Sequence, residues 1–154
     1  MADGCNAFTY PVPENHKHAI VFGIEIGVSL PIPNYPKDHK VKIKQNALVD
    51  TGATGSCVSK KFAQAVKLQY FSMSTVCNSH GKVVVPLYYV DVFLPNGVMI
   101  QNIKVTEFNS DADFDFIIGM DILSLGDVSI TNAGGKMLFS LRMPPNNEHI
   151  DYTK

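Results

Sequence analysis

The chain has few of the residues that build disulfide scaffolds, membrane spans or nucleic-acid surfaces. Its 154 residues include no tryptophan and only three cysteines, an odd number without paired spacing, at Cys5, Cys57 and Cys77. The 13 basic and 14 acidic residues leave a net charge of −1, which gives no sign of a nucleic-acid partner. No apolar run reaches the roughly 18 residues that a membrane-spanning helix needs, and no apolar signal segment opens the chain. These absences favour a reduced, cytoplasmic protein.

The chain is rich in residues that form a hydrophobic core. Hydrophobic residues make up 45% of it and nine are phenylalanine, enough for the core of one domain. Residues 1–17 hold Gly and Pro and few apolar residues, so they predict a flexible arm. We expect the domain itself over residues 18–143, followed by a flexible tail over residues 144–154.

Alternating and continuous apolar runs predict a mostly β protein. A helix is expected over 58–68, with Ser59 as its N-cap, and a short helical segment over 120–125. Strands are expected over 18–28, 40–49, 69–76, 82–94, 98–105, 114–118, 127–131 and 136–142. This order lacks the regular strand–helix alternation of a parallel sheet, so it predicts an all-β domain closed on itself.

One acidic residue stands where a strand is expected to end. Asp50 follows the apolar residues 47–49 and precedes Thr51 and Gly52. Asp is disfavoured in strands and costly to bury unpaired, so it is either a turn residue or a residue held there for chemistry. A second apolar segment, Ile117–Ile118 followed by Gly119, precedes the short helical segment and favours the chemical role.

With these motifs in this order, the chain resembles the retropepsin-like aspartic proteases, the family of the retroviral proteases. The resemblance runs from about residue 20 to about residue 141. It implies a closed β-barrel-like acid protease fold, with one short helix near the C-terminal part and a possible helix after the Asp-Thr-Gly loop. It also implies a homodimer that cleaves a peptide or protein substrate without a metal or cofactor.

The resemblance assigns roles to residues. Asp50 supplies one of two catalytic carboxylates, and Thr51, Gly52 and Ala53 support the loop and contact the second subunit. Ile117, Ile118 and Gly119 pack beneath that loop. The candidate flap over the substrate has its tip at a short segment made of Asn78, Ser79, His80 and Gly81.

Three features differ from the retroviral pattern. Thr54 and Gly55 stand where many retroviral proteases carry acids that grip the substrate backbone. The flap tip has one glycine, and Met120 and Asp121 replace an Arg-Asn pair. These differences keep two other hypotheses open, a peptide- or protein-binding dimer of the same fold that does not cleave, and a structural dimer.

The other acidic and nucleophilic residues favour ordinary roles. Asp111, Asp113 and Asp115 have the alternation of a calcium loop, but Phe116 and Ile122 replace its glycine and glutamate. Cys57 follows the Asp-Thr-Gly loop, and without an indicated base it reads as a small buried residue. The sequence therefore predicts an aspartic-type endopeptidase with Asp50 as its one catalytic residue per chain.

Overall fold

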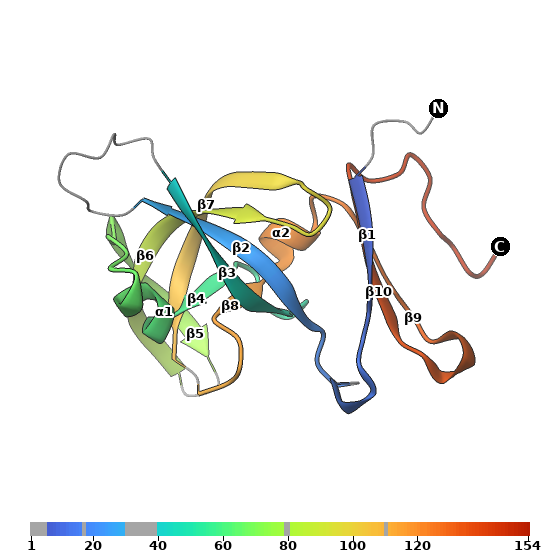
Figure 1. Cartoon of the computed structure of the whole chain (residues 1–154), viewed down its shortest axis with the longest axis horizontal. Helices are drawn as coiled ribbons and strands as arrows, with labels where there is room; N and C mark the ends of the chain where they lie inside the picture. The colour runs from blue at the N-terminus through green and yellow to red at the C-terminus, as the bar shows by residue number, and fades with distance from the viewer. Residues whose placement is uncertain (1–5, 17, 30–39, 79–80, 110) are drawn as a thin grey trace.

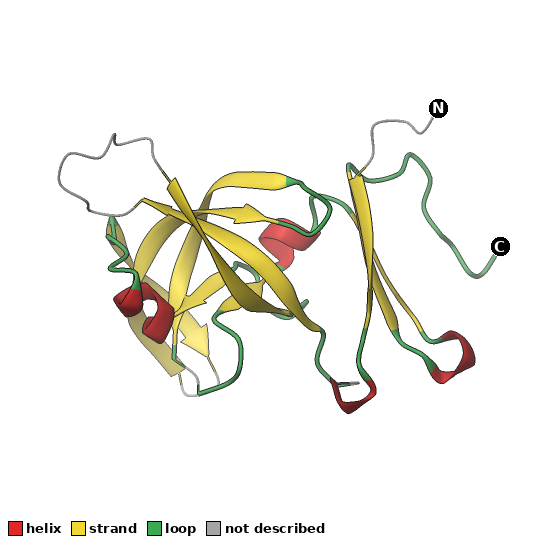
Figure 2. Ribbon diagram, in the orientation of Figure 1, coloured by secondary structure: helices red, strands yellow, loops and turns green. Residues whose placement is uncertain are grey.

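The computed structural model describes residues 6–16, 18–29, 40–78, 81–109 and 111–154. Strands dominate these residues (Figure 2). The elements, in chain order, are β1 Asn6–Pro11, η1 Glu14–His16, β2 Val21–Ser29, β3 Lys40–Val49, β4 Cys57–Ser59, α1 Lys60–Ala65, β5 Ser72–Asn78, β6 Gly81–Phe93, β7 Met99–Phe108, β8 Phe116–Ile118, α2 Met120–Leu123, β9 Asp127–Thr131, η2 Ala133–Gly135 and β10 Leu138–Met143.

The strands form two sheets that share one core. The larger sheet has the order β2-β3-β8-β4-β7-β6-β5, and a further pairing between β2 and β6 closes its first six strands into a barrel. The smaller sheet, β1-β10-β9, stands beside the barrel (Figure 1). Phe22 of the barrel joins the two, because its ring lies 5.2 Å from that of Phe8 and 5.6 Å from that of Phe139. The predicted all-β closed fold is confirmed.

Each of the eight expected strands overlaps an observed strand, but two further strands were not expected. β1 lies inside the segment read as an arm, where it pairs antiparallel with β10. Phe8 and Tyr10 alternate with exposed Ala7 and Thr9, so β1 has the period of a strand. Pro11 argued against a strand here, although proline is tolerated on an edge strand such as β1. The flexibility of the tail, residues 144–154, stays a prediction.

The helix after the Asp-Thr-Gly loop is shorter than expected. Ser59 is its N-cap, as predicted, and its hydroxyl accepts the Phe62 N–H at 2.9 Å. Val58 belongs to the short strand β4 instead, because it is fully buried between β7 and β8. The helix ends before Lys67, whose φ of 53° no α-helix tolerates. The short helical segment near the C-terminal part is α2.

The candidate flap is the end of a hairpin. β5 and β6 pair antiparallel up to Asn78 opposite Gly81. Gly81 has φ 114°, a conformation that glycine adopts at little cost. Ser79 and His80, the other two candidate flap residues, lie outside the described residues.

Within the described part of the chain, no helix is long and apolar enough to cross a membrane.

Candidate active site

Asp50 is held where two parallel strands end side by side. β3 and β8 pair in register from Ala47 with Phe116 to Val49 with Ile118. One residue further, the Asp50 N–H donates to the Ile118 carbonyl at 3.0 Å. The backbone of Asp50 is therefore fixed by the predicted Ile117–Ile118 segment, and its half-buried side chain leaves the sheet at this point.

The loop after Asp50 folds back on the Asp50 carboxylate. The Gly52 N–H donates to Asp50 Oδ1 at 2.8 Å, and the Ala53 N–H donates to the Asp50 carbonyl at 3.2 Å. Thr51 and Gly52 are exposed and Ala53 is half-buried. The loop thus presents a carboxylate, an exposed hydroxyl and a bare glycine backbone together at the surface.

Gly119 is packed against the backbone of this loop. A Cβ atom on Gly119 would lie 2.7 Å from the Gly55 carbonyl carbon, 2.8 Å from its oxygen and 2.9 Å from the Ala53 carbonyl oxygen. The Met120 N–H also donates to the Ala53 carbonyl at 2.8 Å. The predicted close packing of Gly119 beneath the Asp-Thr-Gly loop is what the structure has.

Gly119→Ala should therefore destabilise the protein strongly. The added methyl meets backbone atoms on two residues of a tied loop, so overpacking should cost at least about 2 kcal/mol in the free energy of unfolding, measured by urea denaturation. Gly23→Ala is the matched control, because a Cβ on Gly23 has nothing within 4 Å. The control should stay within about 1 kcal/mol of the parent protein. Equal stability of the two variants would contradict the packing described here.

A serine–aspartate pair ties the loop to α2 and was not expected from the sequence. Asp121 accepts the Ser56 N–H at 2.9 Å and the Ser56 hydroxyl at 2.7 Å. Ser56 Oγ in turn accepts the Gly119 N–H at 3.1 Å. From the sequence alone, Asp121 is only a departure from the retroviral pattern. Its position just inside α2, after the Ile117–Gly119 segment, was the available signal.

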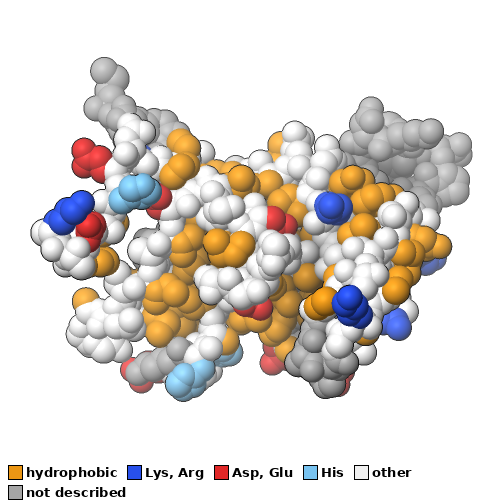
Figure 3. Space-filling model, turned by 180° about the vertical axis from the view of Figure 1, so that it is seen from behind, with side chains coloured by type: hydrophobic (Ala, Val, Ile, Leu, Met, Phe, Trp, Pro, Cys, Tyr) orange, Lys and Arg blue, Asp and Glu red, His pale blue; other side chains and the backbone are white. Residues whose placement is uncertain are grey.

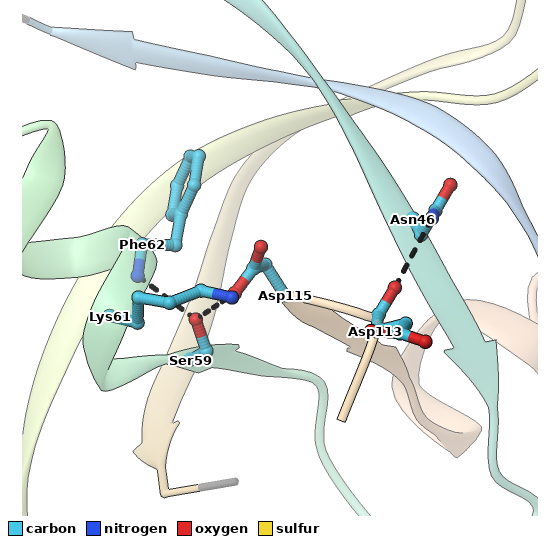
Figure 4. A network of polar contacts seen from close by, with 6 residues as sticks. All are labelled: Asn46, Ser59, Lys61, Phe62, Asp113 and Asp115. Atoms are coloured by element: carbon cyan, nitrogen blue, oxygen red, sulfur yellow. Dashed lines mark hydrogen bonds and ion pairs between the residues drawn. The ribbon is translucent and has the colours of Figure 1, made fainter. Parts of the chain in front are cut away.

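A second polar network holds β8 in place between β3 and β4 (Figure 4). The Ser59 hydroxyl that caps α1 also donates to Asp115 Oδ1, and Lys61 Nζ lies 3.5 Å from the same oxygen. On the other side, the Asn46 amide donates to the Asp113 carbonyl at 3.2 Å. These contacts hold the residues at the start of β8 in place. They therefore also fix the position of the Ile118 carbonyl, which accepts the Asp50 N–H.

A pocket in the described part of the chain lies away from Asp50. It has a volume of about 560 Å³ and is lined by β2, β3 and the β6–β7 turn, with Glu25, Lys44 and Phe93 among its walls. Asp50 is not among its lining residues. Among the described residues, no group of three or more His, Cys, Asp or Glu side chains is placed to hold a metal ion.

The sequence and the fold both have known counterparts. The family model of the gag-polyprotein putative aspartyl protease matches residues 40–125, more than half of the chain. The chain belongs to this family. No curated protein matches the sequence.

Two solved structures show the same fold as this aspartyl protease chain. A retropepsin-like aspartic protease from Rickettsia conorii superposes with a TM-score of 0.56 at 20% identity, covering 90% of this chain and 91% of the other. The EIAV protease in complex with the inhibitor HBY-793 superposes with a TM-score of 0.52 at 19% identity, covering 73% and 92%. Family and fold together point to an aspartic protease, a hydrolase.

Proposed function

We propose that the protein is an aspartic endopeptidase that works as a homodimer, with Asp50 of each subunit forming the catalytic pair. The observation that carries this proposal is the placement of Asp50, in a loop tied by backbone bonds to Ile118 and packed on Gly119. The resemblance of the fold to retropepsin-like proteases agrees with it.

The chemistry follows from two carboxylates that share one proton. Hydrolysis of a peptide bond needs a base that takes a proton from water and an acid that protonates the leaving amine. Two carboxyl groups at contact distance do both, because like charges so close do not both ionise. One chain offers only one Asp-Thr-Gly sequence, so the second carboxylate comes from another copy.

A partly exposed apolar face on the smaller sheet supports the binding of a second copy of the chain. In the smaller sheet, Val128 pairs with Leu141 and Ile130 pairs with Phe139, so all four side chains share one face. Phe139 and Leu141 are buried, whereas Val128 and Ile130 are 37% and 47% exposed on the edge strand β9. A two-fold contact between β9 edges would cover these side chains and satisfy an otherwise open edge.

The exposed parts of the site fit roles at the dimer axis and over the substrate. Thr51 would place its hydroxyl across the axis, and Gly52 and Ala53 would approach the partner loop. An extended peptide would lie under the hairpin end, residues 77–83, and pair with it as an added strand. One face of the molecule presents hydrophobic side chains across its middle, as such a partner or peptide requires (Figure 3).

The proposal predicts a bell-shaped dependence of cleavage on pH, with an acidic optimum. Only the singly protonated pair has both a base and an acid, so the rate should fall when the second proton binds and when the last one leaves. The measurement is the cleavage rate of a diverse peptide pool from acidic to alkaline pH. A rate that stays flat over this range would contradict a carboxylate pair.

A non-cleaving binder is the second candidate function. Thr54 and Gly55 are exposed and uncharged just after the Asp-Thr-Gly loop, so this loop offers no acid to a substrate backbone there. A protein that retains peptides from the pool without cutting any of them, at every pH tested, would support the binder.

A further inference from the structure

One row of side chains crosses the barrel from the Asp50 loop to the base of the flap hairpin. Strand register places these residues directly opposite one another from strand to strand: Leu48, Ile117, Cys57, Thr106, Leu87 and Ser72. The residues next to them in sequence point the other way. Ala47, Phe116, Val58 and Val105, for example, are fully buried in the core.

The row therefore lies on the face that the barrel turns away from its core. Leu48 precedes Asp50 by two positions, so the two share a side of the chain as it leaves β3. Leu48, Ile117, Cys57 and Thr106 are half-buried, as a floor open to a ligand would be. At its far end, Leu87 pairs with Ser72, where the flap hairpin begins. A peptide lying between Asp50 and the hairpin would rest on this row.

The centre of the row is polar, although the positions beside it are apolar. Cys57 Sγ and Thr106 Oγ1 lie 3.1 Å apart, and the Cys57 thiol also lies 3.5 Å from the Gly55 carbonyl, to which it donates. Ile117 stands on one side of this pair and Leu87 on the other. The pair offers a neutral hydroxyl and thiol between two apolar surfaces.

The electrostatic surroundings of this pair are negative. Burial raises the pKa of the Cys57 thiol above its usual value. The hydrogen bonds with Thr106 lower this pKa in part, and the charges of Asp121 and Asp50 raise it. The thiol therefore stays protonated at neutral pH, and a second negative charge beside it is unfavourable. A carboxylate side chain of a ligand would be repelled here.

We infer that Cys57 and Thr106 determine specificity, selecting a small, neutral, hydrogen-bonding side chain of the bound peptide and disfavouring an acidic one. This inference rests on the proposed function for the position of the peptide. Serine, threonine and asparagine side chains fit the chemistry, because each can donate to the Thr106 hydroxyl oxygen, whose own proton goes to Cys57 Sγ while the thiol donates to the Gly55 carbonyl. In an extended peptide, the residues two positions away lie on the same side and would meet Ile117 and Leu87. A neutral hydrogen bond of this kind corresponds to about a three- to tenfold preference.

A randomised peptide pool tests the inference in two ways. The unchanged protein is assayed for cleavage, and Asp50→Asn protein is assayed for retention of peptides, so the preference is read with and without catalysis. The test variant replaces the pair by Cys57→Val together with Thr106→Val. This variant removes both polar groups, keeps the size of residue 106 and adds one carbon atom at residue 57. Thr9→Val is the matched control, since Thr9 is a strand residue whose hydroxyl bonds Ser140 at 2.8 Å in the other sheet.

The expected result is a three- to tenfold enrichment of Ser, Thr and Asn at one peptide position. In the double variant, a preference for Val and Ile should replace this enrichment. In the Thr9→Val control, the enrichment should be unchanged. An enrichment that survives the double substitution would overturn the inference. Selective retention without any cleavage would support the inference and overturn the proposed enzyme. A folded protein that neither cleaves nor retains any peptide would overturn both.

Discussion

Asp50→Asn should abolish proteolysis while leaving the fold intact. An amide neither takes a proton from water nor returns one to the leaving amine, so the rate should fall by about 10²- to 10⁴-fold or more. The side chain keeps its shape, and its amide oxygen still accepts the Gly52 N–H that Asp50 Oδ1 accepts now, at 2.8 Å. The urea midpoint should therefore move little, and the dimer should persist without its pair of like charges.

The control for this variant is Asp113→Asn. Asp113 is an exposed acid in the loop before β8, and its replacement removes the same charge away from the site. This control should cleave the peptide pool at the unchanged rate. If Asp50→Asn cleaved as fast as the control, another residue would have to be the catalyst.

The backbone of the candidate site was predictable because its signals are local. An apolar strand ending in Asp-Thr-Gly, and an apolar pair ending in Gly119, are each readable within a few residues. Their contact followed from the family resemblance, and the Asp50–Ile118 bond and the crowding at Gly119 now give it a physical form. Ser59 as a helix cap was readable for the same reason, since capping depends on residues within one turn.

The polar supports of the site were not predictable, because they depend on strand order. Ser56 and Asp121 are 65 residues apart and meet only when β8 lies beside β4. The Ser59–Asp115 bond arises in the same way. Strand β1 was missed for a different reason, since the proline at its end outweighed the alternation of Phe8 and Tyr10. Signals that lie within a few residues can be predicted from a sequence, whereas hydrogen-bond partners that only the strand order brings together cannot.

Dilution should abolish activity, because a single chain holds one Asp-Thr-Gly and the proposed pair needs two. Below the dissociation constant of the dimer, activity per chain should fall in proportion to concentration. Thr51→Val keeps the shape of the loop and removes the hydroxyl proposed to cross the axis, so it should raise that dissociation constant and lower activity together. Light scattering and cleavage on the same dilution series measure both quantities.

A charge on β9 should have the largest effect on assembly. Ile130→Lys places an ammonium group on the apolar face that the partner is proposed to cover, so it should yield an inactive monomer. Since Ile130 is already 47% exposed, the monomer should stay folded. Ile150→Lys is the matched control, because Ile150 is 74% exposed in the C-terminal segment, outside both sheets, and should tolerate the change. If any of these variants were wholly monomeric by light scattering and still fully active, a catalytic pair made by two chains would be ruled out.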